Sequence, residues 1–131
     1  MNTKLIMTLS AVVLAAIGIG LTFFPAEILQ GLAVGSSTPL LIILQLLGAL
    51  YFGFAMLNWM AKGAVIGGIY NKPISVANAA HFLIGGLALI KALINNPGSP
   101  CFLWALGCVY LVFAICFGII FNRHPANNQT V

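Results

Sequence analysis

Four long apolar runs follow one another along the chain, separated by short segments rich in polar residues, glycine or proline. Each run approaches the roughly 20 apolar residues that a helix needs to cross the hydrocarbon core of a bilayer. The pattern predicts an all-α membrane protein, an up-down four-helix transmembrane bundle that forms a single domain over residues 1–121, followed by a polar cytoplasmic tail at 122–131. The four expected spans cover residues 4–24, 38–60, 74–94 and 101–121.

Prolines mark the limits of these runs. Pro25 ends the first run, because proline cannot continue the hydrogen-bond ladder of a helix, and Thr38-Pro39 is a typical start for the second. Part of the linker 25–37 is apolar and is expected to form a short helix at the membrane interface. The segment Asn95–Pro100 (NNPGSP) is the clearest turn signal, so the third and fourth spans are predicted to be neighbours in an antiparallel hairpin.

The composition excludes a soluble domain. Of the 131 residues, 62% are hydrophobic and 5% are charged, and the mean hydropathy is +1.13, whereas a soluble domain needs a charged surface. The net charge of +4 comes from basic residues at the ends of the spans, where membrane orientation and anionic headgroups explain them better than nucleic acid does. The lipid bilayer is therefore an expected partner, and nucleic acid is not.

The distribution of basic residues predicts the orientation. With four spans, both termini and the second connection share one side of the membrane, and this side carries Lys4, Lys62, Lys72 and Arg123. The other side carries only Lys91. Because basic loops stay in the cytoplasm, we expect a multi-pass protein of the cell (inner) membrane with cytoplasmic N- and C-termini.

The second and third spans carry polar residues at helical spacing. Asn78 and His81 are three residues apart and share one helical face, and Tyr51 and Asn58, seven apart, share another. At about 1.5 Å per residue, His81 lies about 10 Å into the membrane, where an ionisable group is by default a candidate functional site. We therefore expect His81, Asn78, Tyr51 and Asn58 to bind a small apolar or amphipathic ligand, such as a lipid or quinone, in an intramembrane pocket, with a transport-accessory role as one use of it.

His81 is expected to point into the bundle and to hydrogen-bond with Tyr51 or Asn58, while Gly85 on its face leaves room for a neighbour or a ligand. Other residues at a matching depth are Ser10 and Cys116. The alternative is that these polar groups only join helices to one another. The protein would then be a structural subunit of a larger membrane complex, with no ligand site of its own.

Catalysis and metal binding have less support. A lone histidine lacks an orienting acid, so an enzyme using His81 is the weakest hypothesis and no catalytic residue is assigned. Zinc needs three or four ligands, yet the spans hold no second histidine, and the single acid, Glu27, is expected on the opposite side. A haem between two copies of His81 is disfavoured for the same reason. The sequence names no cofactor, and it leaves a homo-oligomer or another membrane subunit as expected partners.

The remaining reactive side chains have simple interpretations. Lys91 can extend its ammonium to the interface, with Glu27 as a candidate partner, and the alternative is an outer site for an anionic headgroup. The three cysteines form no Cys-x-x-Cys pair and are expected to behave as small hydrophobic residues. They are Cys101, Cys108 and Cys116.

Small residues recur four apart in the spans, a spacing that lets helices approach closely. Such pairs are common in apolar helices, so they do not identify a particular interface. The pairs are Ala11/Ala15, Ala16/Gly20, Ala49/Gly53 and Ala114/Gly118.

Three features are to be taken together: a first span that closes in Phe24-Pro25, the segment LLGALYFGFAMLNW that ends at Trp59, and a helix that carries Asn78 and His81. This combination resembles small bacterial four-span membrane proteins of the DoxX-like kind. The resemblance implies a four-helix membrane fold and transfers no functional site. Small multidrug-resistance transporters fit worse, because they need a glutamate in the first span, and vitamin K epoxide reductases need a Cys-x-x-Cys pair.

Overall fold

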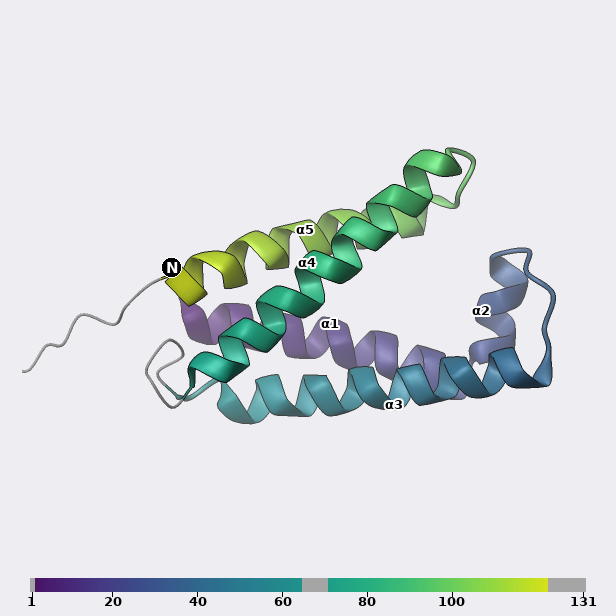
Figure 1. Cartoon of the computed structure of the whole chain (residues 1–131). Coiled ribbons are helices and arrows are strands. Elements are labelled where there is room, and N and C mark those ends of the chain that lie inside the picture. Colours follow the sequence, from purple (N-terminus) through teal and green to yellow (C-terminus); the bar gives the residue numbers. More distant parts are fainter. Residues whose placement is uncertain (1, 65–70, 123–131) are drawn as a thin grey trace, which may run out of the picture. The chain divides into compact units, whose positions relative to one another are not determined.

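The computed structural model describes residues 2–64 and 71–122, and these residues form five α-helices and no strand. Four of the helices are long and apolar enough to cross a membrane, which confirms an all-α, four-helix, multi-pass membrane protein. The predicted tail 122–131 lies outside the described residues except for its first residue. The helices are α1 (Thr3–Phe23), α2 (Pro25–Gly31), α3 (Thr38–Ala61), α4 (Lys72–Asn95) and α5 (Cys101–Asn122) (Figure 1).

The chain divides into two compact units, Met1–Gly63 and Ala64–Val131, called unit 1 and unit 2 below. Unit 1 contains α1, α2 and α3, and unit 2 contains α4 and α5. In each unit the two long helices pack against each other as a hairpin, so the up-down order holds within each unit. The predicted pairing of the third and fourth spans is confirmed. Its turn is closed by a hydrogen bond of 3.0 Å from the Ser99 amide to the Asn96 carbonyl.

Two glycines bring α1 and α3 of unit 1 into close backbone contact. A Cβ placed on Gly18 would lie 2.7 Å from the Phe52 amide nitrogen and 2.8 Å from the Gly48 carbonyl oxygen. A Cβ on Gly48 would in turn lie 2.7 Å from the Gly18 carbonyl oxygen. Any side chain at either position would therefore push the two backbones apart. Of the predicted small-residue pairs, the one at Gly53 has no such role, since nothing lies within 4 Å of its Cβ position.

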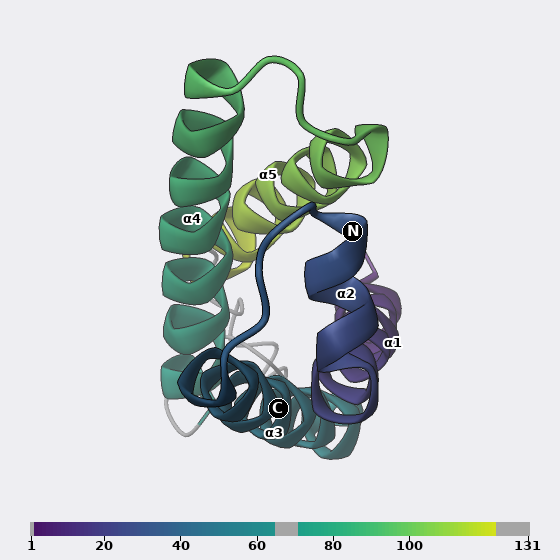
Figure 2. The same cartoon turned by 90° about the vertical axis from the view of Figure 1, so that its right-hand side faces the viewer.

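The linker between α1 and α3 contains the expected short helix, α2, which stands crosswise to the hairpin in two views (Figures 1 and 2). Pro25 occupies its first turn, and Pro25 and Leu29 are buried against the rest of the unit. The helix leaves Ala26, Glu27 and Gln30 exposed on its other side. A helix crosswise to two membrane-spanning helices runs along the membrane plane, which suits an amphipathic interfacial segment.

The chain leaves α2 through a Schellman motif. The Val34 amide donates to the Leu29 carbonyl at 2.9 Å, and the Ala33 amide donates to the Gln30 carbonyl at 3.0 Å. Ala33 has a φ of +55° and is the only residue other than glycine with a positive φ in the described part of the chain. This left-handed position usually belongs to glycine, since a Cβ there costs roughly 1–2 kcal/mol. The motif redirects the chain toward the start of α3.

The surface of both units carries many large apolar side chains, and four polar side chains lie in the otherwise apolar interior. Ser10, Asn58, Ser75 and Asn78 are fully buried. Buried polar groups need hydrogen-bond partners, whereas an apolar exterior matches the hydrocarbon of a bilayer. The large exposed apolar side chains include Leu46 and Leu50 of α3, Ile84 and Leu87 of α4, and Val112 and Ile115 of α5.

In each hairpin a lysine lies beside an aromatic ring at the end opposite the turn, whereas Lys91 lies near the other end of α4. In unit 1, Lys62 follows α3 and its Nζ lies 2.9 Å from the centroid of the Trp59 ring. In unit 2, the Nζ of Lys72, at the start of α4, lies 5.3 Å from the centroid of Phe121, near the end of α5. Aromatic rings at these positions are typical of membrane interfaces, and cation–π contact holds each ammonium beside a ring.

Candidate functional site

His81 contacts Tyr110 across the hairpin of unit 2. Its Nε2 lies 3.4 Å from the Tyr110 hydroxyl, and the two ring centroids are 5.6 Å apart. Tyr110 is buried, whereas His81 is half-buried. Because His81 is ten residues into α4, it lies about two and a half turns from the start of the helix. The hydroxyl donates to Nε2 in one imidazole tautomer and accepts from it in the other.

Two glycines make room for Tyr110. A Cβ on Gly85 would lie 2.8 Å from Cε1 of the tyrosine ring, and a Cβ on Gly86 would lie 3.4 Å from the tyrosine Cβ. Gly85 therefore gives the space beside His81 that its position in the sequence suggested. The neighbour that occupies this space is Tyr110.

An aromatic cluster fixes the position of the tyrosine ring. Phe82 is fully buried, and its ring centroid lies 5.2 Å from that of Tyr110, with the two planes at 72°. The ring centroid of Phe82 also lies 4.9 Å from that of Phe113 and 5.7 Å from that of Phe117, two further residues of α5. Edge-to-face and offset arrangements at such distances add to the stability of packed aromatic rings. The packing of Phe82 against the tyrosine ring therefore holds Tyr110 in place for its contact with His81.

Asn78 lies on the same side of α4 as His81 and is fully buried. Its Nδ2 donates to the Ile74 carbonyl of the preceding turn at 2.9 Å. One turn earlier, Ser75 donates to the Lys72 carbonyl at 2.8 Å. Such bonds satisfy polar donors within the helix itself.

Asn58 joins the two long helices of unit 1. Its Nδ2 donates to Ser10 Oγ at 3.1 Å, and Ser10 donates to the Met7 carbonyl at 3.0 Å. Both side chains are fully buried. Tyr51, two turns before Asn58 in α3, is half-buried. The Asn58–Ser10 hydrogen bond thus connects α3 to α1, and the alternative of a structural subunit stays a prediction.

The four residues expected to bind a ligand fall on two units. Tyr51 and Asn58 belong to unit 1, and Asn78 and His81 belong to unit 2. A pocket lined by all four, and a hydrogen bond from His81 to Tyr51 or Asn58, therefore stay predictions. So does an ion pair between Lys91 and Glu27, which also belong to different units.

Tyr110 was not identified in the sequence, although a signal for it exists. Tyr110, Phe113 and Phe117 are spaced by three and four residues, which places them on one face of a helix. Counting residues from the membrane surface favoured Cys116 instead. That count matches residues by the depth of their Cα atoms in the membrane. A tyrosine hydroxyl lies about the length of one helical turn from its own Cα, so it can meet a residue whose Cα lies at another depth.

Metal-binding side chains are scattered in the described part of the chain. Residues 2–64 and 71–122 contain no group of three or more His, Cys, Asp or Glu side chains that could hold a metal ion together. The cysteines of α5 are free thiols, with Cys101 and Cys108 exposed and Cys116 half-buried.

Comparison with models of protein families, with curated proteins and with solved structures finds no match to this chain. The resemblance to DoxX-like proteins therefore stays a prediction.

Proposed function

We propose that this integral membrane protein binds a small apolar or amphipathic molecule, such as a lipid or a quinone, against the His81–Tyr110 pair. The observation that carries the proposal is a half-buried imidazole 3.4 Å from a phenolic hydroxyl, about two and a half turns inside an apolar helix. Polar groups at that depth are costly in hydrocarbon and are by default candidate functional sites. Because the imidazole is only half-buried, a molecule with a polar end can reach the pair.

The chemistry of the pair indicates the kind of ligand. Together, a phenol and a neutral imidazole offer both a hydrogen-bond donor and an acceptor. A ligand with a carbonyl or hydroxyl group and an apolar body would match the pair and the lipid-like surroundings. In this proposal Asn78, on the same side of α4, belongs to the binding site, and a transport-accessory role is one use of it. A contribution from Tyr51 and Asn58 of unit 1 stays a prediction from the sequence.

The test is to identify the molecule that co-purifies with the protein. We expect solvent extracts of the wild type in lipid nanodiscs to contain one apolar or amphipathic molecule that empty nanodiscs of the same lipid lack, detected by liquid chromatography and mass spectrometry. Tyr110→Phe and His81→Gln should each lower its occupancy several-fold. Ser75→Ala is the matched control, because it also removes a buried hydroxyl from unit 2 but leaves the pair intact. Equal occupancy in all four proteins would contradict the proposal.

The second candidate is a structural subunit of a larger membrane complex. The hydrogen bond between Asn58 and Ser10 favours it, because there a buried polar pair joins two helices. Native mass spectrometry separates the two candidates. A stoichiometric partner protein, with no small molecule, would support the structural subunit. The same spectra would reveal a homo-oligomer.

For the orientation we propose a bacterial inner membrane with both termini in the cytoplasm. Lys62 after α3 and Lys72 at the start of α4 lie at the ends of the hairpins opposite their turns, and they support this orientation. In a cysteine-free background, Gly63→Cys should be labelled by an impermeant thiol reagent only after the membrane is opened. Gly98→Cys should be labelled in intact spheroplasts. The reverse pattern would refute the orientation. A DoxX-like identity remains part of the proposal.

A further inference from the structure

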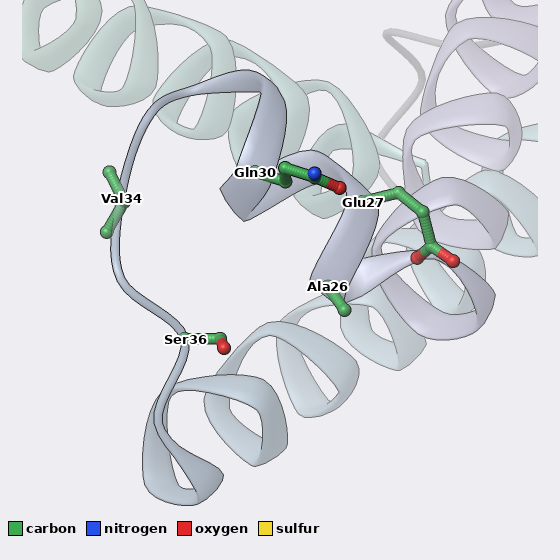
Figure 3. Close-up of a pocket in the computed structure, with 5 residues that line it drawn as sticks. All are labelled: Ala26, Glu27, Gln30, Val34 and Ser36. Carbon is green, nitrogen blue, oxygen red and sulfur yellow. The ribbon is translucent and has the colours of Figure 1, made fainter.

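Unit 1 contains an open cavity of about 350 Å³ between α2 and the segment that leads to α3. Three of its lining residues lie on the exposed side of α2, and two lie on the connecting segment (Figure 3). The cavity belongs to unit 1 alone and is separate from the His81–Tyr110 pair of unit 2. The lining residues are Ala26, Glu27, Gln30, Val34 and Ser36.

The frame of the cavity is fixed by the local fold. The buried Pro25 and Leu29 hold α2 against the rest of the unit. The Schellman motif then turns the chain at Ala33, where φ is +55°, so that the next residues arch away from the helix before the chain enters α3 (Figure 3). The space between helix and segment is therefore a property of the backbone path.

The lining is rich in hydrogen-bond acceptors and carries one negative charge. Glu27 offers a carboxylate, Gln30 an amide oxygen and Ser36 a hydroxyl oxygen. Glu27 is the only acid in the protein. The lysines of unit 1, Lys4 and Lys62, lie near the opposite ends of α1 and α3, about 30 Å away along helices of this length. No lysine of unit 1 can therefore neutralise the carboxylate.

We propose that this cavity binds an organic ammonium group with a short alkyl body. An ammonium can donate to the Glu27 carboxylate, and hydrogen bonds between ionised partners are strong. The Gln30 side chain lies beside Glu27 on α2, whereas Ser36 lies across the opening on the connecting segment (Figure 3). Ala26 and Val34 offer apolar contact to the methylenes. A calcium ion fits less well, because it takes six to eight oxygen ligands and the cavity has a single carboxylate.

The position of α2 indicates the two sources of such a group. Because α2 runs crosswise to the hairpin (Figure 2), it lies at the level of the lipid headgroups when α1 and α3 span the membrane. The ammonium could belong to the headgroup of phosphatidylethanolamine or to a soluble amine. Both present the same chemistry to the cavity.

The experiment uses the full chain in nanodiscs and two probes. In phosphatidylglycerol nanodiscs with a minor fraction of phosphatidylethanolamine, native mass spectrometry counts the retained lipids. In nanodiscs of phosphatidylglycerol alone, titration calorimetry measures the binding of ethanolamine. We expect the wild type to bind at least one probe. Enrichment of the aminolipid alone identifies the lipid as the source, and binding of ethanolamine alone identifies a soluble amine.

Glu27→Gln should weaken binding about tenfold, the low end for hydrogen bonds to charged groups. That change also removes a carboxylate that stabilises the first turn of α2 through the helix dipole. Gln30→Ala keeps Glu27 and should weaken binding about threefold, at the scale of a neutral hydrogen bond. Ser99→Ala, in the turn of unit 2, is the control and should bind as the wild type. Binding of neither probe, or equal binding by the Glu27 variant and the control, would overturn the proposal.

Discussion

Gly18→Ala should separate α1 from α3 and destabilise unit 1. The new methyl group would lie 2.7 Å from the Phe52 nitrogen and 2.8 Å from the Gly48 oxygen. Both atoms belong to backbone and cannot rotate away, so the helices themselves must move. Overpacking of this kind costs roughly 1–3 kcal/mol, and the rigid obstacles place the cost near the upper limit. Alanine in place of glycine in a helix returns about 1 kcal/mol. The expected net loss in the free energy of unfolding is about 2 kcal/mol.

Gly53→Ala is the matched control, because it makes the same chemical change in α3 where nothing lies within 4 Å of the new Cβ. Only the gain of about 1 kcal/mol applies there, so the two variants should differ by about 3 kcal/mol. Reversible unfolding in mixed micelles, titrated with SDS and followed by circular dichroism, measures both. If Gly18→Ala unfolds at the same SDS fraction as Gly53→Ala, then the two backbones do not touch at Gly18 and the packing of unit 1 is wrong.

Three further predictions concern other parts of the fold. Gly85→Ala, 2.8 Å from the Tyr110 ring, should destabilise unit 2 by about 1 kcal/mol in the same SDS titration, whereas Gly118→Ala, with open space around it, should be neutral or stabilising. Tyr110→Phe keeps the aromatic packing and should cost about 0.6 kcal/mol, the average for hydrogen bonds between membrane helices. A loss above about 2 kcal/mol in the free energy of unfolding would mean that the hydroxyl forms stronger interactions than a single hydrogen bond to His81. Ala33→Gly should stabilise the end of α2 by about 0.5–1 kcal/mol, seen as slower hydrogen exchange of the Val34 amide, and faster exchange would contradict it.

The secondary structure could be predicted from sequence because hydrophobic length and proline placement act locally. Pro25 separates α1 from α2 in the structure, and the Asn95–Pro100 turn produces the α4–α5 hairpin. The packing of the helices, however, could not be predicted from such an apolar sequence. When nearly every residue of a helix is apolar, the pattern does not reveal which face meets a neighbour. The spacing of small residues pointed to Ala16 and Gly20, whereas Gly18 makes the close contact.

The candidate site shows the same limit. A histidine in an apolar run could be recognised from sequence, because its cost in hydrocarbon does not depend on its neighbours. Its contact with Tyr110 could not be found by counting depth along the spans, because that contact depends on the rotation of α4 and α5 and on the room left by Gly85. Aromatic periodicity in the fourth span would have been the better guide.

The hydrogen bonds of the buried polar side chains also bear on how the protein enters the membrane. Asn58 of α3 bonds to Ser10 of α1, and His81 of α4 contacts Tyr110 of α5. Each unit can therefore shield these polar groups by closing its own hairpin, before the rest of the chain has been synthesised. A nascent chain that leaves the insertion machinery one hairpin at a time would expose Ser10 or His81 to lipid only until the second long helix of that hairpin arrives. The helices that share buried polar contacts thus follow one another into the membrane, so each polar side chain meets its partner soon after insertion.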